Sequence, residues 1–249
     1  MKVISIFNIK GGVGKTAAAV NLAYASGKSG LKTLVWDLDP QAACTYYFRV
    51  KPKIKKDIGK ALAKNKTLDE SIKATDFENV DILPSDFSYR NLDLVLMDQK
   101  KPKKTLRSAL KNTFGSYDII IVDSPPGIGL LSENIIRASD ILLMPLIPTV
   151  LSVRTCGMLM EHLRSEKIEA GVSVFFSMLD TRRKMHREIA DTFSEEGVKT
   201  LKAYIPYSSD VERMGVARAP VGEFAAGSVS AKSFQKLWEE IITQLREQW

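Results

Sequence analysis

Cysteine and histidine are scarce in this sequence, which has 249 residues but only two of each. Cys44 and Cys156 lie far apart in the chain, so they predict neither a disulfide framework nor a metal-binding knuckle, and we expect both to be small buried side chains. His162 and His186 lie in charged segments of helical character with no second ligand nearby, which favours a surface or packing role over catalysis. The chemistry is therefore expected to depend on other residue types.

Long hydrophobic runs are absent as well. No apolar stretch approaches the length of a membrane span, and the N-terminus leads directly into a predicted strand, so neither a signal peptide nor a transmembrane helix is expected. The composition, 45% hydrophobic and 26% charged, is that of an ordinary globular protein with enough apolar residues for a core. We therefore expect a cytoplasmic protein.

Acidic residues are outnumbered by basic ones, so that the formal net charge is +7 and the isoelectric point is about 9.3. Such a balance favours an acidic partner, of which nucleic acid is the obvious example. The lysines gather in two clusters, residues 51–56 and residues 100–104. Each cluster is equally compatible with a solvated loop, so both interpretations stay open.

The most informative segment is residues 3–16, VISIFNIKGGVGKT. Its β-branched and aromatic beginning predicts a strand buried on both faces of a parallel sheet, and the helix-forming residues 17–23 follow its glycines. Glycines allow the backbone to direct successive N–H groups into a concave site for phosphate. Lys15 is then expected to reach the terminal phosphates, and the Thr16 hydroxyl to hold Mg²⁺. The predicted cradle at the helix N-terminus comprises Gly11, Gly12, Val13, Gly14, Lys15, Thr16 and Ala17.

Two further predicted strands end in aspartates. Residues 31–36 lead into Asp37 and Asp39, and the buried run of residues 117–122 leads into Asp123. Because the carboxyl ends of parallel strands form the edge where open α/β sheets bind ligands, we expect these carboxylates beside the phosphates. Strand alternation would turn Asp37 and Asp39 to the same side. Asp123 has the position of a Walker B aspartate, which holds Mg²⁺.

The predicted strands are mostly separated by predicted helices, which indicates one α/β domain over residues 1–249 with a doubly wound, mostly parallel sheet and helices on both faces. Gly27 and Gly30 are expected to end the first helix. Seven strands are predicted, at residues 3–7, 31–36, 80–83, 117–122, 141–145, 171–178 and 200–205; the clearest later helices are predicted at residues 92–97, 106–114 and 150–164.

The C-terminal segment repeats apolar residues at helical spacing. They fall on one face of a helix: Phe234, Leu237, Trp238, Ile241, Ile242, Leu245 and Trp249. A helix at a membrane surface carries Lys and Arg on its polar face, whereas this one carries Glu239, Glu240 and Glu247 among fewer basic residues. Docking onto the sheet is therefore favoured, and a membrane partner is not expected.

The unit KGGVGKT, residues 10–16, resembles the deviant Walker A motif of the ParA/MinD family of P-loop ATPases. An ordinary P-loop has glycine at the position of Ile9, and Lys10 is the additional lysine of the deviant motif. The resemblance continues through residues 37–41, 123–127 and 180–183, so it covers nearly the whole chain and is strongest to ParA/Soj-like proteins. It implies the P-loop NTPase fold.

The resemblance also implies ATP and Mg²⁺ as cofactors. Lys10 would reach across a dimer to the nucleotide of the partner, Lys15 would bind phosphate, and Asp39 would orient the attacking water. The implied metal shell is Thr16, Asp37 and Asp123, and the turn of residues 124–127 would sense whether ATP or ADP is bound. The implied adenine site lies between Met178 and the turn of Pro206 and Tyr207.

The function implied is that of a partition ATPase. Such a protein forms a homodimer in the ATP state, binds DNA without sequence preference on the nucleoid, and hydrolyses ATP when a ParB-like or cargo-borne adaptor stimulates it, which positions a plasmid, a chromosome or another cargo. Two departures affect this expectation. Ala17 replaces a threonine common in relatives, at a cost of about 1 kcal/mol for one hydrogen bond. Residues 225–231 lack the DNA-binding arginine of Soj relatives, so Arg213, Arg218, Lys232 or the lysine clusters would have to replace it.

Two other functions stay open. A MinD-like membrane ATPase would use the C-terminal amphipathic helix, and a metabolic ATP-dependent synthetase of the same fold would need an additional polar substrate pocket. The iron–sulfur relatives need bridging cysteines after the Walker B strand, and residues 124–134 contain none, which argues against that function.

Overall fold

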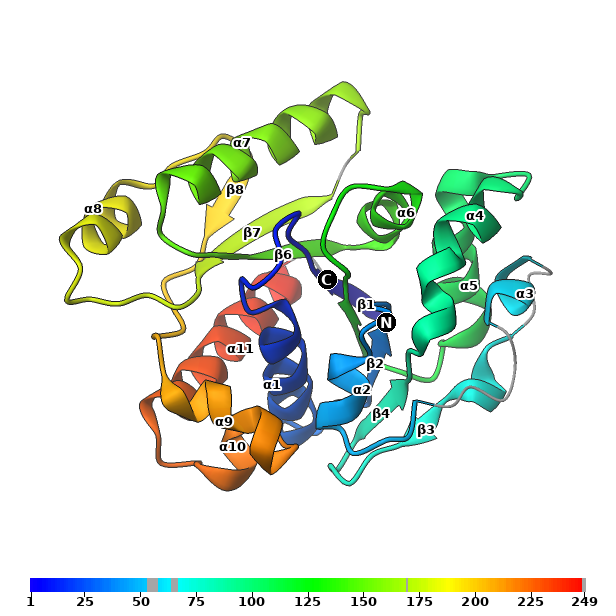
Figure 1. Cartoon of the computed structure of the whole chain (residues 1–249), viewed down its shortest axis with the longest axis horizontal. Coiled ribbons are helices and arrows are strands. Elements are labelled where there is room, and N and C mark those ends of the chain that lie inside the picture. Colours follow the sequence, from blue (N-terminus) through cyan, green and yellow to red (C-terminus); the bar gives the residue numbers. More distant parts are fainter. Residues whose placement is uncertain (53–57, 64–66, 169, 248–249) are drawn as a thin grey trace.

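The computed structural model describes residues 1–52, 58–63, 67–168 and 170–247. Its strands form one sheet in the order β3-β4-β2-β5-β1-β6-β7-β8 (Figure 1). All neighbouring strands run parallel except β3 and β4, which are antiparallel. The strands are β1 (Lys2–Ile6), β2 (Thr33–Asp37), β3 (Lys73–Ala74), β4 (Val80–Leu83), β5 (Ile119–Asp123), β6 (Ile141–Leu146), β7 (Gly171–Phe176) and β8 (Val198–Thr200).

Helices cover both faces of this sheet (Figure 1), so the predicted doubly wound architecture is confirmed. One apolar core lies under α1 (Lys15–Lys28), α9 (Ser209–Ala217), α10 (Val221–Phe224) and α11 (Val229–Glu247). The other lies under α4 (Leu92–Met97), α5 (Thr105–Thr113), α6 (Leu130–Ala138) and α7 (Val150–Ser165). The remaining helices are α2 (Ala43–Tyr47), α3 (Ile58–Ala63) and α8 (Lys184–Thr192), with short 3₁₀ turns η1 (Asp69–Ser71), η2 (Phe87–Asn91) and η3 (Pro102–Lys104).

The central strands carry continuous apolar runs because both of their faces are covered. Every residue of β2, β5 and β6 is buried. The register places Asp37 of β2 beside Asp123 of β5, and Asp123 beside Ile6 of β1. Three neighbouring strands therefore end at one level, where the glycine-rich loop begins.

Two strand predictions are wrong in detail. The edge strand β3 was not predicted, since its two residues are too short to show an alternating pattern. The last strand, β8, covers Val198–Thr200 instead of residues 200–205. Residues 201–205 still follow β7, because the Leu201 N–H donates to the Val174 carbonyl (2.8 Å) and Ile205 N–H to Phe176 (2.8 Å).

Gly27 was predicted to end the first helix, but it lies within α1, which continues to Lys28. A Cβ atom at Gly27 would lie 2.5 Å from the Glu78 carbonyl oxygen and 2.6 Å from a Val80 methyl group. The glycine is therefore a packing contact between α1 and the start of β4, while Gly30, with φ of +85°, reverses the chain after the helix.

The C-terminal helix docks as predicted. Its apolar residues Phe234, Leu237, Trp238, Ile241 and Leu245 are each at most 4% exposed and belong to the core that includes α1. Trp249 of the predicted face lies outside the described residues. Among the helices of the described ranges, none has the length and apolar character needed to cross a membrane.

Candidate nucleotide site

The glycine-rich loop between β1 and α1 is anchored by Asn8, a residue that the sequence did not single out. The buried Asn8 amide donates to the Pro145 carbonyl (2.8 Å), and its Oδ1 accepts the Lys10 N–H (2.9 Å). Gly12 and Gly14 have φ angles of +71° and +90°, in the region that favours glycine. A Cβ atom at Gly14 would also lie 2.8 Å from Ser177 Oγ. The loop therefore leaves no room for a larger residue at this position.

The two lysines of the loop lie in different environments. Lys15 is 6% exposed, and its Nζ donates to the Lys10 carbonyl (2.8 Å). Burial lowers the pKa of Lys15, and the carboxylates of Asp123 and Asp39 act in the opposite direction. The Lys10 side chain is partly exposed and makes no hydrogen bond or ion pair with any residue of the described ranges. Lys10 is thus the lysine that is available to a group outside this chain.

The neighbouring aspartates Asp37 and Asp123 are both fully buried but differ in their hydrogen bonds. Asp37 Oδ2 accepts the N–H (2.8 Å) and the hydroxyl (2.7 Å) of Thr45, and Oδ1 accepts the Asp39 N–H (3.1 Å). Neither carboxylate oxygen of Asp123 has a hydrogen-bond partner among the residues that the structure describes. One carboxylate is therefore satisfied by the protein, and the other is not.

Burial raises the pKa of both groups. It raises the pKa of Asp37 to about 6, although the hydrogen bonds from Thr45 act in the opposite direction. The pKa of Asp123 is raised well above its ordinary value, first by burial and then by the charge of Asp37. The Thr16 hydroxyl lies close enough to lower this pKa, but outside hydrogen-bonding geometry. A buried carboxylate without donors is costly, and a divalent cation would remove that cost.

Asp39 lies close to Asp37 and Asp123, but not for the reason predicted. Strand β2 ends at Asp37, so the alternation of a strand does not extend to Asp39, which lies in the following turn. Asp39 is partly exposed, its Oδ1 accepts the Gln41 N–H (2.9 Å), and its charge raises the pKa of Lys15. Asp39 is therefore near the glycine-rich loop, whereas Asp37 is bonded to Thr45.

The residues present are suited to Mg²⁺ held together with a phosphate ligand. In the described part of the chain, no group of three or more His, Cys, Asp or Glu side chains could hold a metal ion by itself. Mg²⁺ sites commonly use one or two carboxylates and take their remaining ligands from water and phosphate. The unpartnered oxygens of Asp123, with the Thr16 hydroxyl near them, match this donor set, while the oxygens of Asp37 already have donors.

The residues predicted to surround adenine do lie together. A pocket of about 50 Å³ beside the loop is lined by residues that include Gly14, Ala17, Met178, Pro206 and Tyr207. The segments bearing Met178 and Pro206 are joined because the Tyr207 N–H donates to the Leu179 carbonyl (3.1 Å) and the Leu179 N–H to Ile205 (3.0 Å). Ser177 also lines the pocket and was not identified from the sequence.

A larger cavity lies elsewhere, between α1, α10 and α11. Its volume is about 320 Å³, and its lining includes Tyr24, Phe234 and Trp238 but none of the predicted site residues. We place the candidate nucleotide site at the smaller pocket because its lining includes Gly14 of the glycine-rich loop and Ala17 of the following helix.

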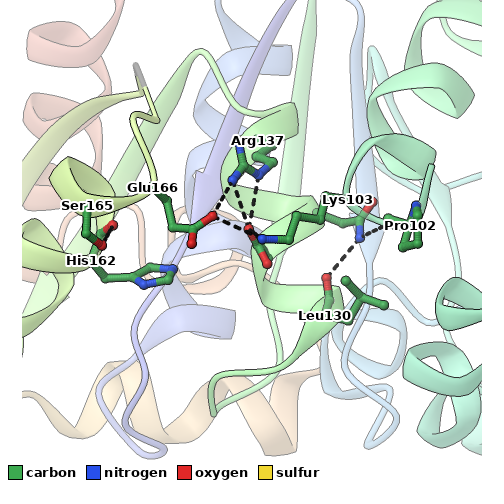
Figure 2. Close-up of polar contacts among 9 residues, drawn as sticks. Pro102, Lys103, Leu130, Arg137, His162, Ser165 and Glu166 are labelled. Carbon is green, nitrogen blue, oxygen red and sulfur yellow. Dashed lines mark hydrogen bonds and ion pairs between the residues drawn. The ribbon is translucent and has the colours of Figure 1, made fainter.

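The second lysine cluster is partly used within the protein. Figure 2 shows Lys103 in a network in which its Nζ contacts Glu133 (2.8 Å) and Glu166 (3.0 Å), while Arg137 bonds both carboxylates at 2.9 Å. Lys103 is therefore exposed but ion-paired, whereas the exposed side chains of Lys100, Lys101 and Lys104 make no ion pair with residues of the described ranges. The first cluster, residues 51–56, lies largely outside the described residues.

The other basic candidates from the sequence are engaged to different degrees. Arg213 lies 3.6 Å from Asp210. Arg218 donates to the Tyr46 carbonyl (3.2 Å), and its guanidinium stacks on the Tyr46 ring. A further basic surface, which the sequence did not indicate as a DNA candidate, lies at the start of α8. It consists of the exposed residues Arg182, Arg183, Lys184 and Arg187. Arg182 and Arg183 lie 2.9 and 3.9 Å from Asp180, and Lys184 lies 3.5 Å from Glu188.

Known proteins match this chain along its length. Residues 1–170 match a family model described as an AAA domain. The chromosome-partitioning ATPase Soj of Treponema pallidum is 25% identical over 251 residues, 98% of each chain, and the sporulation initiation inhibitor protein Soj of Bacillus subtilis is 30% identical over 212 residues, 80% of this chain and 83% of that protein.

Solved structures show the same fold. A plasmid partition protein from Borrelia burgdorferi bound to AMPPNP superimposes with a TM-score of 0.84 at 22% identity, over 98% of this chain and 99% of that chain. Cobyrinic acid a,c-diamide synthase from Mycobacterium smegmatis, with a bound ATP analogue and magnesium, gives a TM-score of 0.81 at 21% identity, over 100% and 97%. At these identities the structures speak for the fold, and the family follows from the sequence matches. This chain belongs to the ParA/MinD family of P-loop ATPases.

Proposed function

We propose that this protein is a partition ATPase that dimerises on ATP, binds DNA without sequence preference in that state, and hydrolyses ATP on contact with an adaptor protein. The observation that carries the proposal is the contrast within one loop, where Lys15 is buried and bonded while Lys10 has no partner in the described structure. The similarity to chromosome-partitioning Soj over 98% of the chain supports the same function.

The cofactors of the proposal are ATP and Mg²⁺. The loop N–H groups and Lys15 would hold the phosphates once Lys15 leaves the Lys10 carbonyl, and Asp123 with Thr16 would hold Mg²⁺, which neutralises phosphate charge. Asp39 would orient the attacking water. Adenine would enter the pocket of Met178, Pro206 and Tyr207.

Catalysis would require two copies of the chain. Phosphoryl transfer is accelerated mainly by positioning and by charge stabilisation, and a cation supplied from a second protein chain is an effective source of both. An exposed lysine on the phosphate loop can serve the partner's nucleotide, whereas a buried lysine serves its own. Each Lys10 would thus complete the site of the other protomer.

Replacing Asp39 with alanine is expected to leave ATP binding intact and to slow hydrolysis about a hundredfold, as for loss of a group that handles the attacking water. The ATP-bound dimer would then persist, which size-exclusion chromatography with ATP measures directly. Asp39 is suited to this test because it is partly exposed and its side chain makes one hydrogen bond, from the Gln41 N–H, within the described ranges. Normal hydrolysis by Asp39→Ala would show that the assigned role is wrong.

DNA binding would be electrostatic. We assign it to the basic surface of Arg182, Arg183, Lys184 and Arg187, where four exposed cations lie within six residues and outnumber the two carboxylates that pair with them, Asp180 and Glu188. Affinity for random-sequence DNA, measured with ATP by fluorescence anisotropy, is expected to fall as salt rises, with a slope in log–log form of about −0.9 for each phosphate contact.

A matched pair of variants locates this surface. Joint replacement of Arg183, Lys184 and Arg187 by alanine is expected to weaken binding and reduce the salt slope. The same change at Lys100, Lys101 and Lys104, which are also exposed, is expected to do neither. Binding that does not depend on salt would contradict the electrostatic proposal, and the reverse result for the two variants would move the site to the lysine cluster.

The two alternatives have less support. A membrane role would use the apolar face of α11, but the described residues of that face are packed into the core next to α1. A synthetase role rests on similarity of fold to the Mycobacterium enzyme alone. Measuring the ATPase rate with and without DNA separates these functions, since stimulation by DNA is expected of a partition ATPase. The proposed location is the cytoplasm, on the nucleoid, where the protein would encounter DNA.

A further inference from the structure

Thr45 occupies the centre of a buried hydrogen-bond network beside the acidic turn. Its hydroxyl donates to Asp37 Oδ2 (2.7 Å) and accepts the N–H of Ser85 (3.0 Å), and its own N–H donates to the same Asp37 oxygen (2.8 Å). Thr45, Asp37 and Ser85 are all fully buried. The hydroxyl uses its donor and an acceptor position at once, so no apolar side chain can replace its bonding.

The network connects three separate parts of the chain. Asp37 ends β2, Thr45 lies in the first turns of α2, and Ser85 follows β4. The other oxygen of Asp37 accepts the N–H of Asp39 (3.1 Å), which fixes the backbone of the turn carrying that residue. The bonds thus run from Ser85 through Thr45 and Asp37 to Asp39.

Asp37 is placed to transmit position more than to hold an ion. Within the described ranges, the Asp37 carboxylate is bonded to Thr45 and Asp39, whereas the oxygens of the adjacent Asp123 are unpartnered. Two buried carboxylates side by side repel each other when both are ionised, as the effect of the Asp37 charge on Asp123 shows. The Thr45 hydroxyl and N–H hold Asp37 in one orientation.

We propose that Thr45 is a positioning residue for ATP hydrolysis, because its hydroxyl fixes Asp37 and through it the turn that carries Asp39. The inference rests on the proposed ATPase function and adds a residue that does not touch the nucleotide. The three acidic residues then have separate roles, in which Asp123 faces the metal, Asp39 faces the water, and Asp37 with Thr45 holds the turn of Asp39 in place.

The test compares two substitutions that remove the Thr45 hydroxyl with one that keeps it. Thr45→Val and the smaller Thr45→Ala are expected to lower kcat about tenfold or more, the effect of one hydrogen bond to a charged group, with KM for ATP within about twofold of the wild type. Thr45→Ser is expected to restore kcat. Binding of fluorescent ADP with Mg²⁺, a measurement independent of turnover, is expected to change little in all three variants.

Thr33→Val is the matched control. Thr33 is equally buried, lies at the other end of β2, and its hydroxyl is bonded to Ser26 (2.6 Å) and to the Leu31 carbonyl (3.0 Å). This variant is expected to lower the thermal midpoint but to keep kcat, which separates loss of stability from loss of positioning.

Three results would be decisive against the proposals. Unchanged kcat in Thr45→Val and Thr45→Ala, or an equally slow Thr45→Ser, would overturn the assignment of Thr45 while leaving the ATPase function intact. Failure of the wild-type protein to hydrolyse ATP, with and without DNA, would overturn the proposed function itself. If Thr45→Val does not fold, kcat of Thr45→Ala compared with that of Thr45→Ser decides the assignment.

Discussion

The Lys10→Ala variant is expected to bind ATP about as tightly as the wild type but to hydrolyse it about a thousandfold more slowly, the effect of removing a cation supplied by a second chain. The reason is the position of Lys10, which is partly exposed on the phosphate loop and has no partner in the described structure. Its loss therefore removes no bond from the folded monomer. Steady-state ATPase assays and analytical ultracentrifugation with ATP test the rate and the dimer together.

Lys15→Ala provides the contrast. Lys15 lies at the base of the same loop, and its ammonium is bonded to the Lys10 carbonyl. Burial lowers its pKa, and the nearby charges of Asp123 and Asp39 oppose that shift. This variant is expected to lose ATP binding itself. If Lys10→Ala hydrolyses ATP at the wild-type rate or dimerises normally, the two-chain site is wrong. If both variants lose binding equally, the lysines share one role within the monomer.

The features of the site that the sequence predicted are those carried by contiguous residues. A strand, a glycine-rich turn and a helix stand side by side in residues 3–23, and Asp123 follows a run of β-branched residues. Their close approach followed from one rule, that parallel strands end at a common edge. Asp37 and Asp123 are in register as that rule requires.

The features that were missed depend on contacts between distant residues. Thr45 is an ordinary helix residue until the fold brings it to Asp37 and Ser85, and Asn8 acquires its role from the Pro145 carbonyl. Ser177 limits Gly14 from the end of another strand. Of these residues, Asn8 alone had a local signal, as a polar residue after an apolar strand. The error at Asp39 was of another kind, because strand alternation was extended past the end of β2.

Replacing Asp123 with asparagine is expected to abolish ATP hydrolysis and yet to stabilise the nucleotide-free protein. The two oxygens of Asp123 are buried without a partner in the described structure. The amide of asparagine is still polar but carries no charge, so the substitution removes the cost of burying an ionised carboxylate, and we expect a gain of about 1 kcal/mol or more in the free energy of unfolding. We expect the Asp123 carboxylate to be needed for activity in spite of this cost, because Mg²⁺ prefers negatively charged oxygen ligands. Urea unfolding of both proteins without nucleotide, at one fixed pH of about 8, measures the gain in the free energy of unfolding, because that free energy depends on pH.

The raised pKa values of Asp123 and Asp37 determine how the free energy of unfolding changes with pH. The folded-state pKa of Asp123 lies well above its ordinary value, and that of Asp37 is about 6, so the folded protein binds protons more strongly than the unfolded chain. The resulting stabilisation is complete below the unfolded-state pKa and is lost as pH rises through the folded-state values. The wild type should therefore lose stability from about pH 4 upwards, and Asp123→Asn should lose less.

A control and a ligand test distinguish this explanation from a general effect of removing charge. Asp39→Asn, which removes a partly exposed carboxylate near the same site, is expected to change the free energy of unfolding by less than about 0.5 kcal/mol. Adding ADP with Mg²⁺ should stabilise the wild type more than Asp123→Asn, because the ion compensates the buried charge only where that charge exists. An Asp123→Asn protein that is less stable than the wild type and has the same pH dependence would show that Asp123 is not the uncompensated charge at the end of β5.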